Sequence, residues 1–173
     1  MIRHTDDDVA ALQALLERSA LSAGDFLRDT FEMPGHALTA RQLTGYFEQR
    51  IRSVAVATVT ARGEPRVSPV GAFFYGAKFH IPTAAQAVRV RHLRSRPAIS
   101  LTHFVLNSIA VIVHGRAEIL TPEHPQFADL ASLDTMRPEK WWRALHDQRR
   151  GVIVRVEARL MYAWAKDPSQ FPS

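Results

Sequence analysis

The stretch with the clearest chemical content is FHIPTAAQAVRVRHL, residues 79–93. A strand is expected to end at Thr83, small residues follow, and a helix then begins that carries Arg89 and Arg91 in its first two turns. A hydroxyl at a strand end, free amides at a helix N-terminus and a guanidinium group are three components of a phosphate site. Taken by themselves, these residues fit a phosphate site and a solvated basic helix equally well.

The charge balance of the chain also points to an anionic partner. The net charge is +5, and arginine provides 19 of the 22 basic residues, although an arginine- and alanine-rich composition also fits a GC-rich genome. A basic balance is typical of proteins that bind nucleic acid or a phosphorylated small molecule. The arginines are not interleaved with aromatic residues, as they are in many nucleic-acid binders. We therefore expect a small-molecule ligand and no nucleic-acid partner.

Several other kinds of site are excluded by the composition and the motifs. The chain has no cysteine, so disulfides and thiolate metal sites cannot form. No histidine stands at metal-ligand spacing with a carboxylate, so no metal site is expected. No Gly-x-Gly-x-x-Gly, P-loop or Ser-His-Asp pattern occurs, and no catalytic residue is assigned. Four histidines on or beside strands are expected to be core-edge or surface residues, with a ligand contact as the alternative for the last two: His80, His92, His103 and His114.

The chain carries no membrane or export signal that we recognise. It has no run of about 18 apolar residues, so no segment is expected to span a bilayer. Asp6, Asp7 and Asp8 stand where a secretory signal would be basic. We expect a cytoplasmic protein without a membrane partner.

The first 52 residues are predicted to be helical. Asp6 is expected to cap a first helix, a second helix is expected over 23–30, and Thr39 is expected to cap a third over 40–52. We predict that residues 1–52 form a helical extension packed on the main fold, residues 53–173, with both parts in one structural domain.

Residues 53–173 are predicted to be mainly strands. Six strands are expected over 53–60, 66–74, 78–81, 98–104, 108–120 and 151–164. Helices are expected over 84–95 and, within an insert at 123–148, over 138–148. Short turns between most strands, with Gly63 in the first of them, favour an antiparallel, closed or nearly closed barrel. The fold class is therefore mainly β, a six-stranded antiparallel barrel with peripheral helices.

Three pieces of this region carry a resemblance to a known family. They are VATVTARGEPRVSPV, FHIPTAAQAVRVRHLRSRPAISL and IAVIVHGRAEIL, and they stand in order within residues 54–120. In this region the chain resembles the pyridoxamine 5′-phosphate oxidase-like, FMN-binding split barrels. The resemblance implies a split β-barrel that binds FMN.

The resemblance also implies which residues contact the cofactor. A Ser or Thr at the end of the third strand and a basic residue six positions later hold the flavin phosphate in the family, which here are Thr83 and Arg89. Trp164 would form a wall of the substrate pocket. The segment of the second strand and two positions of the fourth would lie at the ring or the ribityl chain: Arg66, Val67, Ser68, Pro69, Ser100 and Thr102.

The chain departs from the family pattern at three positions. Pro82 stands where a small polar residue is common, His92 replaces a frequent Asn, and Gly71 stands where an aromatic residue often occurs. These departures imply an altered ring pocket and leave the phosphate ligands in place, since Arg89 keeps the charge of a lysine. The resemblance assigns no substrate-binding residue of the vitamin B6 oxidase to this chain, so that activity is not implied.

The resemblance leaves three functions open. The first is an FMN-dependent oxidoreductase with an unassigned small-molecule substrate, in which the flavin supplies the redox chemistry. The second is a reductase that uses the 5-deazaflavin F420 on the same fold. The third is a flavin- or haem-binding module without turnover. Family barrels form homodimers with the cofactor between subunits, and the apolar run at 109–113 also favours a homodimer, because its outward residues would need a partner.

Overall fold

The computed structural model describes residues 4–48, 52–133 and 150–171. The helix expected over 138–148 lies outside these residues. Six strands form one closed antiparallel barrel in the order β1-β2-β3-β6-β5-β4. They are β1 Arg52–Val59, β2 Pro65–Tyr75, β3 Lys78–Ala84, β4 Ala98–Val105, β5 Ile109–Leu120 and β6 Gly151–Ala165. The predicted fold class is confirmed.

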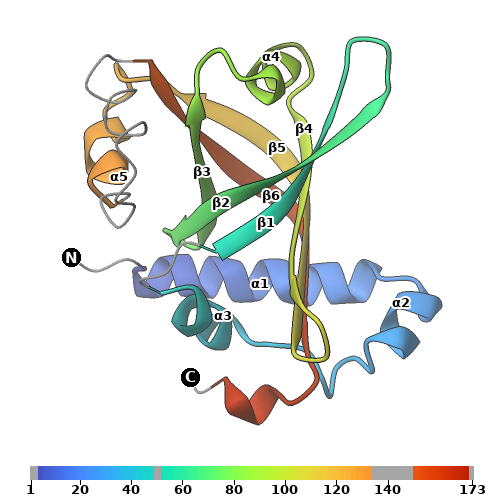
Figure 1. The fold of residues 1–173 in the computed structure, drawn as a ribbon. Helices are drawn as coiled ribbons and strands as arrows, with labels where there is room; N and C mark the ends of the chain where they lie inside the picture. The colour runs from blue at the N-terminus through green and yellow to red at the C-terminus, as the bar shows by residue number, and fades with distance from the viewer. Residues whose placement is uncertain (1–3, 49–51, 134–149, 172–173) are drawn as a thin grey trace.

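Helices lie at the periphery of the barrel (Figure 1). In Figure 1, α1 and α3 lie across the lower end of the barrel, and α4 lies over the upper end, where it connects β3 to β4. The helices are α1 Asp6–Ser22, α2 Asp25–Thr30, α3 Ala40–Phe47, α4 Val88–Ser95 and α5 Phe127–Leu133, followed by the short 3-10 helix η2 Pro168–Gln170.

The start of α1 differs from the prediction. Thr5, and not Asp6, is the N-cap: its hydroxyl accepts a hydrogen bond from the Asp8 amide at 3.1 Å. The Asp8 carboxylate in turn accepts one from the Thr5 amide at 2.8 Å. This reciprocal capping box satisfies two amides at once, whereas Asp6 as the cap would satisfy one.

Two predicted helices are shorter in the structure. The helix expected over 40–52 ends at Phe47, because Arg52 already pairs with Ala72 in the barrel. The helix expected over 84–95 begins at Val88, because Ala84 still pairs with Gly151 of β6. Strand pairing with distant residues decides both ends, so local helix propensity could not locate them.

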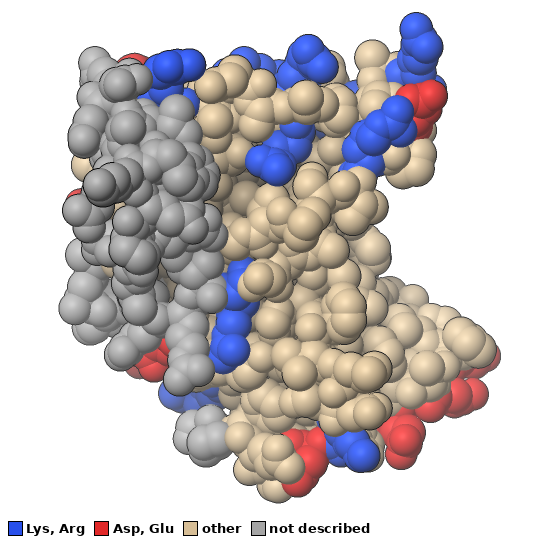
Figure 2. All heavy atoms as spheres, viewed as in Figure 1, with Lys and Arg blue, Asp and Glu red and all other residues tan. Residues whose placement is uncertain are grey.

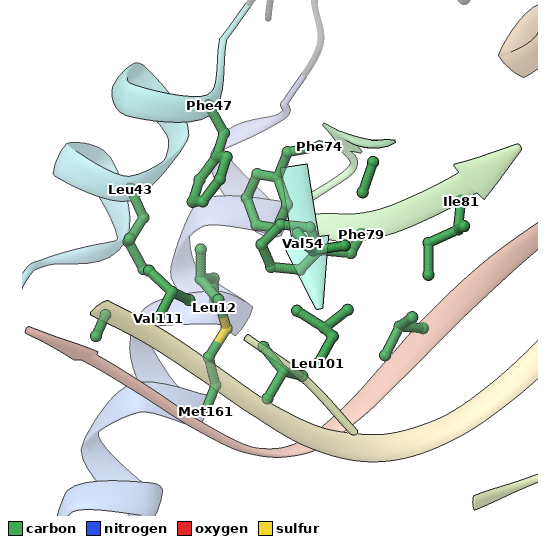
Figure 3. Close-up of a cluster of buried hydrophobic side chains, with 14 of the residues drawn as sticks. Leu12, Leu43, Phe47, Val54, Phe74, Phe79, Ile81, Leu101, Val111 and Met161 are labelled. Atoms are coloured by element: carbon green, nitrogen blue, oxygen red, sulfur yellow. The ribbon is translucent and has the colours of Figure 1, made fainter. Parts of the chain in front are cut away.

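Alternate residues of the strands fill the barrel (Figure 3). Val54, Leu101 and Val111 come from three different strands and are each almost fully buried. Leu12 of α1 belongs to the same cluster, and Phe47 of α3 packs edge-on against Phe79 with ring centroids 5.0 Å apart. The N-terminal helices therefore share the hydrophobic core of the barrel.

The second strand is held unevenly along its length. Its last residues, Phe73 to Tyr75, pair with β3, whereas its first half pairs with β1 only. Gly63 has a φ of +86° in the turn between β1 and β2, which a residue with a side chain adopts only with strain. Because it pairs with one strand only, the first half of β2 is exposed, and Val67 keeps 69% of its surface accessible.

Within the described residues, no helix is both long and apolar enough to cross a lipid bilayer.

Candidate functional site

Thr83 and Arg89 lie side by side at the upper end of the barrel. Thr83 is the penultimate residue of β3, and Arg89 is in the first turn of α4. The Arg89 Nη1 atom donates a hydrogen bond of 2.7 Å to the Thr83 hydroxyl. Because the hydroxyl oxygen accepts this bond, its own proton remains free to be donated to a ligand.

Arg89 is a half-buried cation with donors to spare. Its Nε atom is buried and has no hydrogen-bond partner, and no carboxylate of the described residues forms an ion pair with it. Burial lowers the pKa of Arg89 from its usual value, because removal from water disfavours the charged form. A guanidinium in this position is stabilised by an anion, which would supply the missing acceptors.

The start of α4 adds two backbone donors. Ala87 at the N-cap provides no side-chain hydrogen bond. Among the described residues, the amides of Val88 and Arg89 also have no backbone acceptor. Such uncapped amides at a helix start attract anionic groups. The Thr83 hydroxyl and the Arg89 guanidinium expected from the sequence are therefore in contact, and the free amides belong to the same first turn of α4 as Arg89.

A buried hydrogen bond holds α4 against the barrel. The ring Nδ1 of His92 lies 3.0 Å from the hydroxyl oxygen of Thr58 on β1, and both residues are buried. Val90 and Leu93 on the same helix belong to the core. His92 was expected at the core edge or the surface. Its spacing of three residues from Arg89 was visible in the sequence, but its partner on β1 was not.

Four of the predicted ring contacts lie on the outer face of the barrel. Val67 is opposite Ala57, which is opposite Ser100, so these residues form one row across β2, β1 and β4. Pro69, Ala55 and Thr102 form the neighbouring row. Side chains in neighbouring rows of one face lie within contact distance of a flat ligand.

The structure does not bring the other two β2 residues to this face. Ser68 alternates with Val67 and is opposite Val56, whose side chain points into the barrel. Arg66 is exposed near the start of the strand, and its Nη2 atom pairs with the Glu64 carboxylate at 2.7 Å. Only the backbone of these residues lies beside the rows that contain Val67 and Pro69.

The hydroxyls of β4 contact neighbouring groups of β5. The Thr102 hydroxyl donates to the Val111 carbonyl at 3.0 Å. The Ser100 hydroxyl oxygen lies 2.8 Å from the ring Nδ1 of His114, which is exposed. His114 was named as a histidine with an alternative ligand contact, and the structure places it in the row of Val67 and Ser100.

Trp164 lies elsewhere on the outer face. It is opposite Ala110 on β5, four residues from His114, a separation of roughly 13 Å along a strand. The rings of Phe31 and His36 stack on its indole with centroids 5.9 and 6.2 Å away. The structure therefore does not bring Trp164 together with the rows around Ser100.

Basic side chains gather near the candidate site. Figure 2 shows Lys and Arg at the upper end of this face, over α4 and the tip of the β1–β2 hairpin, and most of the visible Asp and Glu toward the lower end. Arg62, Arg91 and Arg94 are exposed residues of this hairpin and helix. Part of the basic charge that the composition indicated thus lies on the helix that carries Arg89 and on the hairpin tip at the same end of the barrel.

A comparison with protein-family models matches residues 44–165 to the model described as pyridoxamine 5′-phosphate oxidase. The matched residues include every described strand of the barrel. A search of curated proteins finds no match.

Solved structures share the fold at low sequence identity. The haem storage protein HutZ from Vibrio cholerae has a TM-score of 0.58 at 16% identity, covering 69% of this chain and 90% of that one. An FAD-binding protein from Mesorhizobium loti has a TM-score of 0.55 at 17% identity, with coverages of 75% and 94%. A protein named F420 reductase has a TM-score of 0.52 at 18% identity, with coverages of 67% and 93%. At these identities the likeness concerns the fold alone.

Proposed function

Because the chain belongs to the pyridoxamine 5′-phosphate oxidase family, we propose that it binds flavin mononucleotide and acts as an oxidoreductase on a small-molecule substrate. The family match covers every strand and the helix that carries Arg89. The proposal concerns this family chemistry in general and not the oxidation of vitamin B6.

The observation that carries the proposal is the state of Arg89. A half-buried guanidinium that bonds Thr83 and keeps a buried Nε without a partner is costly in the absence of an anion. A phosphate group would accept hydrogen bonds from Arg89, the Thr83 hydroxyl and the amides at the start of α4. These donors hold the cofactor and take no part in electron transfer.

The remaining predicted contacts would position the flavin ring. Val67 and Pro69 on β2 provide an apolar surface, and Ser100 and Thr102 on β4 provide hydroxyls two strands away in the same rows. When bound there, a flavin supplies two-electron chemistry that no side chain of the protein provides. The protein binds, orients and shields the ring.

A second subunit would complete this site. The outer face of β2, β1 and β4 carries half-exposed or exposed apolar residues around the proposed ring position: Ala55, Ala57, Val67 and Pro69. An apolar surface of this kind is typical of subunit interfaces. We include in the proposal a homodimer with the cofactor at the interface.

Two alternatives on the same fold remain, a deazaflavin-dependent reductase and a flavin- or haem-binding module without turnover. Two of the solved structures that share the fold are named F420 reductase and haem storage protein, and each name supports one of these alternatives. The absorption spectrum of the purified protein identifies the cofactor, since oxidised FMN absorbs near ~450 nm, a deazaflavin near ~420 nm, and haem shows a Soret band. A deazaflavin or haem spectrum would contradict the FMN proposal. A flavin-binding module without turnover would show the FMN spectrum too, and only catalytic reduction and reoxidation of the bound flavin separates an oxidoreductase from it.

The phosphate site is tested by replacing Arg89. The Arg89→Ala variant loses a charge-assisted hydrogen bond worth roughly 1.5–3 kcal/mol, so FMN affinity should fall about 10- to 100-fold. The measurement is a titration of FMN fluorescence quenching. Arg94→Ala is the matched control, because Arg94 is an exposed arginine in the last turn of the same helix, and its affinity should equal that of wild type. Equal affinities for Arg89→Ala and wild type would exclude the assigned phosphate site.

A further inference from the structure

A mostly apolar groove of about 340 Å³ lies on the outer face of the barrel, across β1, β4, β5 and β6. We call it the outer groove. Ala57, Pro65 and Leu160 contribute apolar walls, and Ser100, His114 and Arg159 contribute the polar groups that the argument below uses. An apolar hollow with a few convergent polar groups is the usual form of a small-molecule site.

A break in strand register brings Arg159 to this groove. His114 is opposite Leu160, whereas the next residue, Gly115, is opposite Ala158. Arg159 therefore has no partner on β5 and is the extra residue of a β-bulge. In a regular strand Arg159 and Leu160 would point to opposite faces of the sheet, but here both line the outer groove. Bulges often redirect a side chain in this way beside a functional site.

Glycine at position 115 permits the bulge. A Cβ atom placed on Gly115 would lie 2.2 Å from the Glu157 carbonyl oxygen, well inside contact distance. The backbones of β5 and β6 can therefore come this close only if residue 115 has no side chain. The position of Arg159 thus depends on a local geometry that this glycine makes accessible.

The polar groups of the groove have unused hydrogen-bonding capacity. Arg159 is exposed, and the described part of the chain provides neither a hydrogen-bond acceptor nor a carboxylate for its guanidinium. His114 uses Nδ1 for its 2.8 Å contact with the Ser100 hydroxyl. Its Nε2 atom has no partner among the described residues and remains available to a ligand.

We propose that the outer groove binds a small apolar molecule that carries a carboxylate, with Arg159 pairing the carboxylate and the Nε2 atom of His114 hydrogen-bonding the ligand. The cation matches an anionic group, and the surrounding Ala57, Pro65 and Leu160 match an apolar body. Ser100 is also a proposed contact of the flavin ring, so a ligand in the outer groove would lie beside the flavin. The inference that such carboxylates are the substrates of the protein therefore rests on the proposed function. The binding of the ligand itself does not depend on that function.

The test uses benzoate as the probe and benzamide as its uncharged match. Both are titrated into the FMN-loaded protein and followed by NMR of the histidine ring resonances, with His114→Gln assigning the signal of His114. Wild type should bind benzoate more tightly than benzamide. Arg159→Gln should weaken benzoate about 10-fold and leave benzamide unchanged, because a charge-assisted contact is lost. Arg116→Gln is the matched control: Arg116 is exposed on the neighbouring strand and does not line the groove.

Three results would overturn the proposal. They are the absence of benzoate binding to wild type at millimolar concentration, equal benzoate affinities for wild type and Arg159→Gln, and release of bound FMN as benzoate is added, which would assign the groove to the flavin ring. FMN affinity is measured in parallel and should be the same for Arg159→Gln and wild type. Failure of the protein to bind FMN with benzoate binding retained would contradict the proposed function and leave the groove as a binding site.

Discussion

At the scale of single residues, each candidate site combines an arginine without an ion pair and other polar groups beside it: Thr83 lies beside Arg89, and His114 lines the same groove as Arg159. Some charged side chains lie in ion pairs, such as Lys78 with Glu157 at 2.8 Å and Arg155 with Glu118 at 2.6 Å. Arg89 and Arg159 have no such partner in the described part of the chain. Surface ion pairs contribute little to stability, so an exposed arginine without a pair is ordinary by itself. The polar groups that lie beside Arg89 and Arg159 distinguish these two arginines from the others.

The histidines differ from one another as single residues. His80 is 2% exposed, stacks on Phe73 with ring centroids 5.2 Å apart, and places Nδ1 at 3.0 Å from the Lys78 carbonyl. Burial is the main cause that lowers the pKa of His80 to about 3, and the charges of Arg155 and Lys78 lower it further. His80 is therefore neutral in the folded protein at all ordinary pH values.

This burial predicts a pH dependence of stability. The unfolded chain protonates His80 near pH 6.5, whereas the folded chain does so only near pH 3. Since the unfolded state binds more protons between these values, the free energy of unfolding should decrease as the pH falls, by up to about 1.4 kcal/mol per pH unit for this group. Urea unfolding of wild type and His80→Gln at pH 6 and pH 4 measures the effect. The glutamine variant should lose less stability than wild type, and parallel losses would contradict the prediction.

At the scale of elements, the α4 helix and the β5–β6 bulge place the candidate groups. The α4 helix is short and contains Arg89, Val90, His92 and Leu93, so one helix both carries the phosphate donor and packs against the core. Its bond to Thr58 connects it to β1, whose outward residues Ala55 and Ala57 lie in the rows of the proposed ring contacts. The phosphate and ring positions are therefore coupled through one strand.

The β5–β6 bulge requires a residue without a side chain at position 115, and the Gly115→Ala variant tests this requirement. The added Cβ would meet the backbone of Glu157, which cannot rotate away as a side chain could. Overpacking of this kind costs roughly 1–3 kcal/mol, so the urea midpoint should decrease. Gly35→Ala is the matched control, because its Cβ would lie 3.5 Å from the nearest atom, the Glu32 carbonyl oxygen, at ordinary contact distance. Unchanged midpoints for both variants would show that the strands separate at little cost.

At the scale of the whole molecule, the barrel has two different surfaces. The N-terminal helices cover its lower end through Leu12 and Phe47, which belong to the same core as the strands. The outer face of β2, β1 and β4 keeps apolar residues accessible, most clearly Val67. The proposed homodimer would cover this face.

A light-scattering measurement tests the homodimer. The expected mass at micromolar concentration is twice the 19.5 kDa of one chain. Val67→Asp should shift the mass toward one chain, since a charge would be buried at the interface without a partner. Leu21→Asp is the control, because Leu21 is also an exposed apolar residue, at 81%, but belongs to α1. A single-chain mass for wild type would contradict the homodimer.

Much of the architecture could be predicted from the sequence because it depends on local signals. Alternating apolar residues such as Val54 and Val56 define strands, and Gly63 marks a turn that requires a positive φ. The closeness of Thr83 and Arg89 could also be predicted, since these residues are six positions apart, one at the end of a strand and the other at the start of the next helix. The strands and turns, and the closeness of Thr83 to Arg89, therefore follow from neighbours along the chain, whereas the assignment of these two residues to a phosphate came from the family resemblance.

Only the tertiary structure decided which distant residues share a face. The pairing of Val67 with Ala57 and of Ala57 with Ser100 determines the rows at the proposed ring position, and a shift of one residue would turn each side chain to the other face. The bulge that turns Arg159 outward arises from the contact of Gly115 with Glu157, 42 residues away in the chain. Strand register and bulges are set by packing of the whole barrel, because many non-local contacts must be satisfied at once, and no local pattern encodes them.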